Sequence, residues 1–395
     1  MSTTIHQLSI DAGSRFVSKK GLTLYLFEPQ RMEGLSTFLF AAMTLAIGVP
    51  SSIASADVWS VSNLHPAIAT FSEAYSASDG MQVGQASIGG QYHASLWSGS
   101  ADSWVDLDPA GSTESYANGV SGSQQVGYAL VGGHYRASLW SGSAISWVDL
   151  SPSGSTDSSA NGIFGGHQVG EVLVGNQYHA SLWNGTAASW VDLNPVGSVD
   201  SRAIGVGDGQ QVGYASVGGQ FRASLWSGSA DSWVDLSPVG SNESYAYGVS
   251  SGQQVGRVVV GGQYRAGLWS NSAASWVDLN PAGSLWSIAF GVWGKQQVGE
   301  AAVGGYGRAS LWSGSAASWF DLGALLPADF TISSARGIWS DANFTYVVGY
   351  GFNTVSGRNE ALLWTQAIPE PGAVALFGLG YLLVAMRRRR ARRFV

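Results

Sequence analysis

The sequence contains no cysteine, and only 11% of its 395 residues are charged. The lack of cysteine excludes disulfide bonds, cysteine-ligated zinc sites and thiol nucleophiles. What is plentiful is glycine, with 54 residues, and tryptophan, with 17. So many aromatic residues argue against a disordered chain, and so many glycines argue against a helical one. The composition therefore favours many short β-strands joined by tight turns.

Basic residues are scarce in the central part of the chain. Residues 57–366 contain 22 Asp and Glu but only 9 Lys and Arg, a net charge of −13. Binding to a phosphate backbone depends mainly on Lys and Arg. We therefore expect no nucleic-acid partner.

An apolar run near the N-terminus predicts export. Residues 35–49, LSTFLFAAMTLAIGV, have the length of the hydrophobic region of a signal peptide, and Ala54 and Ala56 form the small-residue cleavage site that follows. We therefore expect residues 1–56 to be an export signal region with an extended N-terminus. An uncleaved membrane anchor is the alternative, which the shortness of the run disfavours.

The C-terminal segment, residues 367–395, combines three signals in a fixed order. The triplet Pro369, Glu370 and Pro371 precedes the 15 uncharged residues 372–386, and an arginine cluster follows. An apolar run of this kind enters the bilayer while the arginines stay on the cytoplasmic side. This arrangement resembles the PEP-CTERM sorting tail of exported bacterial proteins. The resemblance implies an exosortase as partner, membrane attachment in transit, cleavage near the triplet and delivery to the cell surface or the extracellular matrix.

A unit of 43 residues repeats along the body of the chain. It is marked by a Leu-Trp pair, whose tryptophans are Trp97, Trp140, Trp183, Trp226, Trp269 and Trp312, with Trp364 following after 52 residues. The second unit divides into four strands, QQVGYALV, HYRASLW, SWVDL and TDSSANGI. Four strands in about 40 residues are typical of a β-propeller blade. A β-solenoid is the alternative, although its repeats are usually shorter.

The two ends of the body predict how the ring closes. The first half-unit, from QVG to LW, occurs seven times, and so does the second half-unit if Trp59 and residues 72–80 form its first copy. The body therefore starts and stops in mid-unit. We predict an all-β, seven-bladed propeller over residues 57–366, in which N-terminal and C-terminal strands share one blade and leave no open sheet edge.

The repeated segment HASLW, followed by DL, GS and GQQVG, resembles the HAF-type extracellular repeat over residues 59–364. Serine replaces the phenylalanine of that repeat at Ser95, Ser138 and Ser181. The resemblance implies an exported, propeller-like protein and supplies no catalytic residues.

An aspartate precedes the turn of each unit and is expected to accept hydrogen bonds from the backbone of that turn. Calcium is the alternative in the first unit, where Asp106 and Asp108 put two carboxylates in one small loop. No spacing among the histidines resembles a metal site, so we predict no cofactor. The turn aspartates are Asp106, Asp149, Asp192, Asp235, Asp278 and Asp321.

A basic residue recurs at one register position before the alanine of the HASLW strand. These side chains either surround the channel and attract an anionic polysaccharide or pair locally with the turn aspartates, and we favour local pairing. The position is occupied by His93, Arg136, His179, Arg222, Arg265, Arg308 and, in the seventh copy, Glu360.

The signals for catalysis are weak. Residues 248–252, GVSSG, match the nucleophile-elbow pattern, which requires a strand-to-helix turn. The same position in other units reads GVSGS, GIFGG or GVGDG, so we expect an ordinary turn there. Acid, base and nucleophile must differ from one another, whereas the loops of this ring are nearly uniform. We therefore predict a protein that is not an enzyme, with an extracellular carbohydrate-active hydrolase or lyase as the alternative.

The repeat loses its uniformity in the last third of the chain. Trp286 replaces a residue that is acidic in several other units, Trp293 follows it, and the irregular stretch 323–346 adds Trp339. Clustered exposed aromatic side chains often mark a binding surface, and flat rings suit the apolar faces of sugars. We predict that these three tryptophans bind an exopolysaccharide or another surface protein. A patch that fills the closure of the ring, in a purely structural matrix protein, is the alternative.

Overall fold

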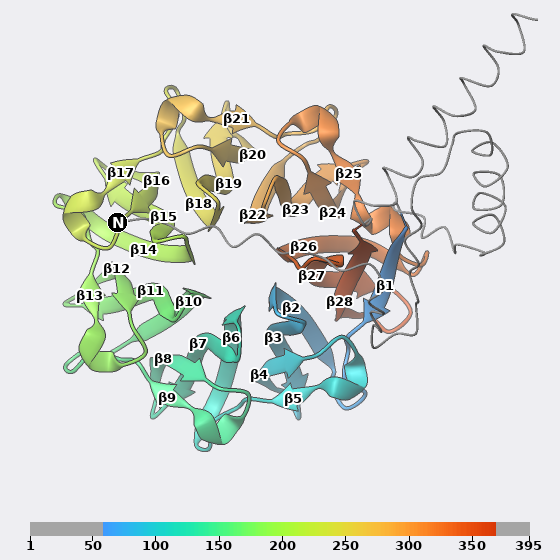
Figure 1. Cartoon of the computed structure of the whole chain (residues 1–395), viewed down its shortest axis with the longest axis horizontal. Helices are drawn as coiled ribbons and strands as arrows, with labels where there is room; N and C mark the ends of the chain where they lie inside the picture. The colour runs from blue at the N-terminus through green and yellow to red at the C-terminus, as the bar shows by residue number, and fades with distance from the viewer. Residues whose placement is uncertain (1–57, 369–395) are drawn as a thin grey trace, which may run out of the picture. The chain divides into compact units, whose positions relative to one another are not determined.

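The computed structural model describes residues 58–368, which form a ring of seven four-stranded antiparallel sheets (Figure 1). The predicted seven-bladed propeller is confirmed. The predicted export region with Ala54 and Ala56, and the sorting residues Pro369, Glu370 and Pro371, lie outside the described residues. Within residues 58–368, no helix has the length and apolar character needed to cross a membrane.

The strands of each blade are ordered from the channel outward as follows. The first three blades contain β2 (Phe71–Ser78), β3 (Met81–Ile88), β4 (Gln91–Trp97) and β5 (Val105–Asp106); β6 (Ser112–Ser121), β7 (Gln124–Val131), β8 (His134–Trp140) and β9 (Val148–Asp149); and β10 (Ser158–Phe164), β11 (His167–Val174), β12 (Gln177–Trp183) and β13 (Val191–Asp192). The next three contain β14 (Ser198–Gly207), β15 (Gln210–Val217), β16 (Gln220–Trp226) and β17 (Val234–Asp235); β18 (Glu243–Ser250), β19 (Gln253–Val260), β20 (Gln263–Trp269) and β21 (Val277–Asp278); and β22 (Ser287–Trp293), β23 (Gln296–Val303), β24 (Tyr306–Trp312) and β25 (Phe320–Asp321). The seventh contains β26 (Phe330–Ser340), β27 (Phe344–Asn353), β28 (Arg358–Ala367) and β1 (Trp59–Asn63).

The ring closes through β1, as predicted. This N-terminal strand pairs antiparallel with β28, from Trp59 opposite Gln366 to Asn63 opposite Leu362. It supplies the outermost strand of the seventh blade, so the first and last strands of the propeller share one sheet. Side chains add to this closure, because the Asn63 Nδ2 donates a 2.7 Å hydrogen bond to the Oε2 of Glu360 on β28.

The third predicted strand of each unit, SWVDL, is shorter than expected. In the second unit only Val148 and Asp149 pair with the sheet, and a 3₁₀ turn over Ala144–Ser146 precedes them. The Oγ of Ser146 accepts a 2.8 Å hydrogen bond from the N–H of Ser141, which stabilises the turn in place of a strand. Six 3₁₀ turns of this kind, η1 to η6, cover Ala101–Ser103, Ala144–Ser146, Ala187–Ser189, Ala230–Ser232, Ala273–Ser275 and Ala316–Ser318, and η7 covers Leu322–Leu325.

The Leu-Trp tryptophans fill the space between neighbouring blades, as expected. Trp183 of the third blade is fully buried and packs with Val126 and Leu139 of the second blade. A buried indole removes a large apolar area from water, which offsets the entropy lost on ordering a glycine-rich chain. The same arrangement recurs around the ring, so the core consists of seven similar clusters between blades.

Candidate functional site

Each innermost strand carries a β-bulge near its middle. In the fifth blade Ala246 lies opposite Gly256 and Gly248 lies opposite Val255, so Tyr247 between them has no partner on β19. Bulges of this kind redirect a side chain and are frequent next to binding sites. The residues at the seven bulges are Tyr75, Asn118, Asn161, Ile204, Tyr247, Phe290 and Arg336.

The glycine of the repeated QVG segment makes the bulge possible. A Cβ atom on Gly256 would overlap the carbonyl oxygen of Tyr245, which the bulge turns toward β19. A second glycine, directly after the bulge, lets neighbouring blades approach closely: a Cβ atom on Gly205 would lie 2.6 Å from the carbonyl oxygen of Tyr247. These glycines are therefore required by backbone packing around the channel.

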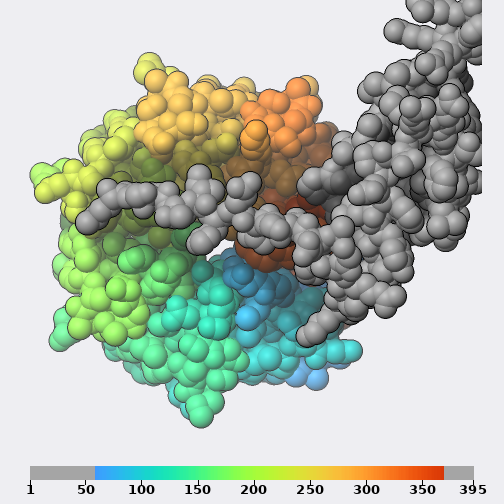
Figure 2. All heavy atoms as spheres, viewed as in Figure 1, coloured from blue at the N-terminus to red at the C-terminus, as the bar shows by residue number. Residues whose placement is uncertain are grey.

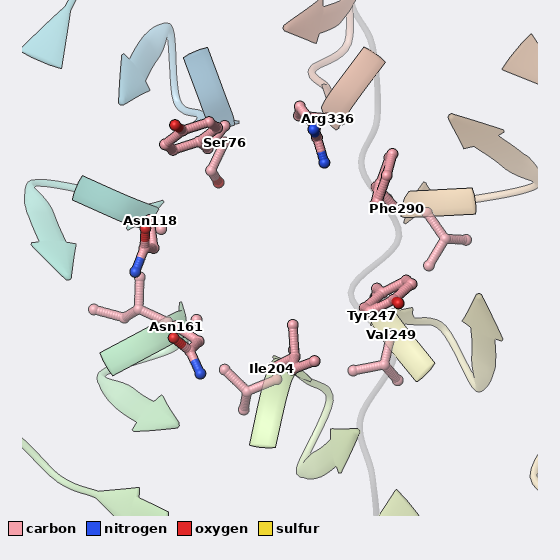
Figure 3. A pocket seen from close by; sticks show the side chains of 18 of the residues that line it. Ser76, Asn118, Asn161, Ile204, Tyr247, Val249, Phe290 and Arg336 are labelled. Carbon is pink, nitrogen blue, oxygen red and sulfur yellow. The ribbon is translucent and has the colours of Figure 1, made fainter. Parts of the chain in front are cut away.

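The bulged residues surround a central cavity of about 600 Å³. The blades are arranged around this opening (Figure 2), and the labelled side chains, which come from all of the blades, surround it (Figure 3). Asn118 and Asn161 put amide groups on one part of the wall, whereas Tyr247, Phe290 and Arg336 put two aromatic rings and a cation on another. The ring is therefore nearly uniform in backbone but not in the chemistry of its cavity.

The residue two positions before each bulge and the residue after each QVG also vary between units. They gather at the end of the cavity where the innermost strands begin, and we call their aromatic and basic members the tyrosine mouth: Tyr116, Tyr128, Arg202, Tyr214, Tyr245, Arg257 and Tyr350. The same two positions also hold the carboxyl groups of Glu73, Glu171 and Glu300. Tyr116 and Tyr128 stack with ring centroids 4.7 Å apart, and Tyr214 meets Tyr245 edge to face at 5.0 Å. The mouth therefore presents ordered aromatic groups.

Three arginines lie flat on aromatic rings at the cavity and its tyrosine mouth. The guanidinium carbon is 4.5 Å from the ring centroid of Tyr178 for Arg202, 4.5 Å from that of Tyr245 for Arg257, and 4.2 Å from that of Phe290 for Arg336. These distances are those of cation–π contacts. The Nε of each of the three arginines is buried without an acceptor among the described residues.

One buried carboxyl group, that of Glu171, lines the same cavity. Burial raises its pKa to about 7, although Arg202, whose Nη1 lies 3.5 Å away, and the amide of Asn161 both act in the opposite direction. The Nδ2 of Asn161 donates a 2.5 Å hydrogen bond to the Oε2 of Glu171. Near neutral pH this site therefore holds a carboxyl group that is protonated part of the time. Burial also raises the pKa of the neighbouring Tyr214 to about 12.

Two of the three predicted tryptophans lie together at the other end of the channel. The rings of Trp293 and Trp339 have centroids 6.3 Å apart, and Trp339 stacks on Tyr346 at 5.5 Å. Both tryptophans line a cavity of about 320 Å³ that also includes Asp79 and Asp208. We call this end the tryptophan mouth.

Trp286 does not join this cluster, so the prediction of one surface with three tryptophans is wrong. It precedes β22, which starts at Ser287 and ends at Trp293. A seven-residue strand is roughly 20 Å long, so residues at its two ends lie on opposite faces of the ring. Trp286 is also half-buried rather than exposed. A role for any of these tryptophans in binding remains a prediction.

Five of the six repeated basic residues pair with the turn aspartates, as favoured from the sequence, whereas Arg136 has no Asp or Glu oxygen within 4.0 Å among residues 58–368. The Nδ1 of His93 lies 2.8 Å from the Oδ2 of Asp106, and the Nη1 of Arg222 lies 2.7 Å from the Oδ2 of Asp235. These residues belong to the third strand of each blade, so they do not line the channel. Further pairs are His179–Asp192, Arg265–Asp278 and Arg308–Asp321.

The turn aspartates also have the backbone role expected of them. The Oδ1 of Asp106 accepts a 2.8 Å hydrogen bond from the N–H of Asp108. The Oδ1 of Asp108 in turn accepts hydrogen bonds from Ser112 and Ser115. Among residues 58–368, no three or more His, Asp or Glu side chains are grouped in a way that would hold a metal ion.

The GVSSG segment is a turn, as expected. Ser250 ends β18, and Ser251, with a φ of 52°, starts the tight connection to β19. The chain continues into a strand rather than a helix, so the geometry of a nucleophile elbow is missing here.

The seven bulged residues were missed by the sequence analysis. Their signal was present, since each is the second variable residue of the S-x-A-x-G segment. The prediction treated this position as part of a uniform strand, although its residue varies between tyrosine, asparagine, isoleucine, phenylalanine and arginine.

A family model described as the PEP-CTERM protein-sorting motif matches residues 367–390. The match implies an exported surface protein that is anchored in the membrane through its C-terminus before processing, and it is consistent with processing by an exosortase. No curated protein matches the chain.

Solved structures resemble this chain at low identity. TolB from Acinetobacter baumannii is 11% identical, with a TM-score of 0.44 over 75% of this chain and 71% of that one. The β-propeller domain of the Trilobed protease from Pyrococcus furiosus is 8% identical, with a TM-score of 0.46 over 76% and 98%. A structure of YCF48 bound to D1 peptide is 10% identical, with a TM-score of 0.47 over 79% and 97%.

Proposed function

We propose that this chain is a surface or extracellular-matrix protein whose propeller binds a polysaccharide, without catalysis, through the central cavity and its tyrosine mouth. In this proposal the repeats are of the HAF type, an exosortase processes the tail, and the ligand is an exopolysaccharide. The observation that carries the proposal is the set of seven bulged residues, because the repeats diverge where the side chains face the cavity.

The chemistry of the cavity suits a sugar. Aromatic faces such as those of Tyr247 and Phe290 pack well against the apolar face of a pyranose ring. On another part of the wall, the amide oxygens of Asn118 and Asn161 offer acceptors for hydroxyl groups, and the Asn118 amide, which donates one N–H to the carbonyl oxygen of Ala160, has a second N–H to offer. The tryptophan mouth, with Trp293 and Trp339, provides a second aromatic surface for a long polymer that spans the ring.

The test is binding of the purified full-length chain to a panel of neutral and acidic bacterial polysaccharides, measured by calorimetry. We expect saturable binding to at least one polymer. Replacing Phe290 or Tyr247 with alanine should weaken it about tenfold, the effect of losing about 1.4 kcal/mol at a packed aromatic contact. Tyr306→Ala, which removes a ring that is 61% exposed on β24, is the matched control and should bind normally. Failure of the folded chain to bind any glycan would refute the proposal and direct attention to protein partners.

An extracellular hydrolase or lyase is the second candidate, and Glu171 is the observation that favours it. A carboxyl group with a pKa of about 7 in a cavity can act as a general acid. Glycoside hydrolysis usually needs two carboxyl groups, and Glu171 is the only one among the described residues that line this cavity. Release of reducing or unsaturated ends from a bound polymer, abolished in Glu171→Gln with binding retained, would establish this alternative.

A further inference from the structure

We infer that the polysaccharide is acidic and that Arg336 binds its carboxylate. This inference rests on the function proposed above and adds the chemical class of the ligand and the residue that recognises its charge.

Two arginines line the central cavity, and they differ in their partners. Arg202 has a carboxylate neighbour, because its Nη1 lies 3.5 Å from the Oε1 of Glu171. Arg336 has no Asp or Glu oxygen within 4.0 Å among residues 58–368. Its Nη2 instead donates a 3.2 Å hydrogen bond to the hydroxyl group of Tyr350.

The guanidinium of Arg336 is partly removed from water and has no carboxylate in direct contact. The side chain is half-buried, its Nε has no acceptor, and its guanidinium lies on the ring of Phe290. The Tyr350 hydroxyl group and the carboxyl groups of Glu300 and Glu73 offset the loss of hydration and raise the pKa of Arg336, but neither carboxyl group contacts the guanidinium directly. An anion that enters the cavity would supply the missing partner.

The position of Arg336 sets it apart from the other arginines of the ring. Residues 57–366 carry a net charge of −13, and carboxylates are abundant. Five of the eight arginines among residues 58–368 lie within 4.0 Å of a carboxylate oxygen, whereas Arg136, Arg257 and Arg336 do not. Of these three, Arg336 is the one that lines the central cavity, where a ligand can reach it (Figure 3).

The neighbours of Arg336 indicate a sugar acid as the ligand. Phe290, at the bulge of the preceding blade, places its ring against the guanidinium, and Tyr247, at the bulge of the blade before that, has its ring centroid 5.7 Å from that of Phe290 on the same cavity wall. A planar guanidinium fork matches a carboxylate with two parallel hydrogen bonds. A uronate residue combines both features, with an apolar ring face for the aromatic groups and a carboxylate for Arg336. The partly neutralised carboxyl group of Glu171 reduces repulsion of this ligand.

The test compares oligogalacturonate and alginate oligosaccharides with their methyl esters, which keep the sugar backbone and remove its charge. For at least one of the two sugars we expect the full-length chain to bind the acid at least about tenfold more tightly than the ester, as a charge-assisted hydrogen bond predicts. In Arg336→Gln the acid and the ester should bind equally well. Arg336→Lys keeps the charge and should retain part of the preference. Arg265→Gln, which removes an arginine paired with Asp278 on a third strand, is the control and should behave as the wild type.

Three results would overturn the inference: equal binding of acid and ester by the wild type, a preference that survives in Arg336→Gln, or no binding of any of the four probes. Circular dichroism shows whether each variant is folded. If a neutral polysaccharide is bound and Phe290→Ala weakens it, the proposed function stands and only the acidic ligand is rejected. If no glycan of any charge is bound, the proposed function itself fails.

Discussion

The indole Nε1 of Trp233 donates a 2.8 Å hydrogen bond to the Oγ of Ser224, nine residues earlier in the chain. The same bond joins the second tryptophan of a unit to the serine of its HASLW-type strand in four further units. In the fifth unit Gly267 replaces the serine, and the Nε1 of Trp276 is buried without a partner. The repeated serine therefore fixes a tryptophan toward the outer edge of five blades.

Ser224→Ala should lower the free energy of unfolding by about 1–3 kcal/mol, because it leaves the Trp233 indole N–H without an acceptor. Urea-induced unfolding followed by tryptophan fluorescence measures this change. The fifth unit supplies the comparison: Trp276→Phe removes an N–H that has no acceptor and should cost less than Trp233→Phe. Equal costs for the two tryptophans would show that the serine bond contributes little.

Gly213→Ala should destabilise the ring by about 3 kcal/mol or more, because the added Cβ atom would overlap the carbonyl oxygen of Arg202 at the bulge of the fourth blade. Gly219→Ala is the control in the same blade. Gly219 has a φ of +79° and open space around it, so only backbone strain of about 1 kcal/mol is expected. Thermal and urea unfolding of the two variants give the difference. A smaller cost for Gly213→Ala would mean that the bulge is not needed for the fold.

The free energy of unfolding should fall as the pH rises from about 4.5 to about 7, because burial raises the pKa of Glu171 from 4.5 to about 7. Between these two pH values the Glu171 carboxyl group is ionised in the unfolded chain but still protonated in the folded chain. The folded state is therefore more stable at the acidic end of this range than at the neutral end. The decline amounts to about 3 kcal/mol in all. Glu171→Gln should lack this decline and be more stable than the wild type above pH 7. Asp231→Asn, at an exposed turn, is the control and should show the same decline in the free energy of unfolding as the wild type. If the decline persists in Glu171→Gln, another titratable group causes it.

Glu360→Ala should weaken the closure of the ring. The Glu360 carboxylate accepts hydrogen bonds from Asn63 at 2.7 Å, Ser356 at 2.8 Å and Arg358 at 3.2 Å. Burial alone would raise the pKa of Glu360, but these hydrogen bonds together lower it below the value of 4.5 in the unfolded chain. Their stabilisation of the fold is therefore fully present above pH 4.5 and is lost as the pH falls through the lowered pKa of the folded state.

We expect the Glu360→Ala substitution to cost about 2 kcal/mol and to speed proteolysis between β1 and β2. Mass spectrometry of the protease fragments identifies the site of cleavage. Asp231→Ala is the control. Faster cleavage elsewhere in the ring, with the segment between β1 and β2 unaffected, would contradict a role for Glu360 in closure.

The sequence predicted the fold well because the fold follows from spacing. Tryptophans 43 residues apart, and half-units that each occur seven times, determine the number of blades and the shared closing blade. The cavity was not predicted, because a bulge is a property of two paired strands. The pairing of Ala246 with Gly256 shows that Tyr247 is the extra residue. The separation of Trp286 from Trp293 likewise needs the direction of β22 through the ring.

The bulges also separate the variable side chains of the cavity from the residues that keep the protein folded. Tyr75, Ile204 and Arg336 differ in size, polarity and charge, yet each occupies an equivalent place in the same backbone. The buried tryptophans, the glycine after the bulge and the glycine opposite it on the next strand carry the structural constraints. Under the proposed function, single substitutions at these seven sites change specificity one blade at a time, without a compensating change in the core.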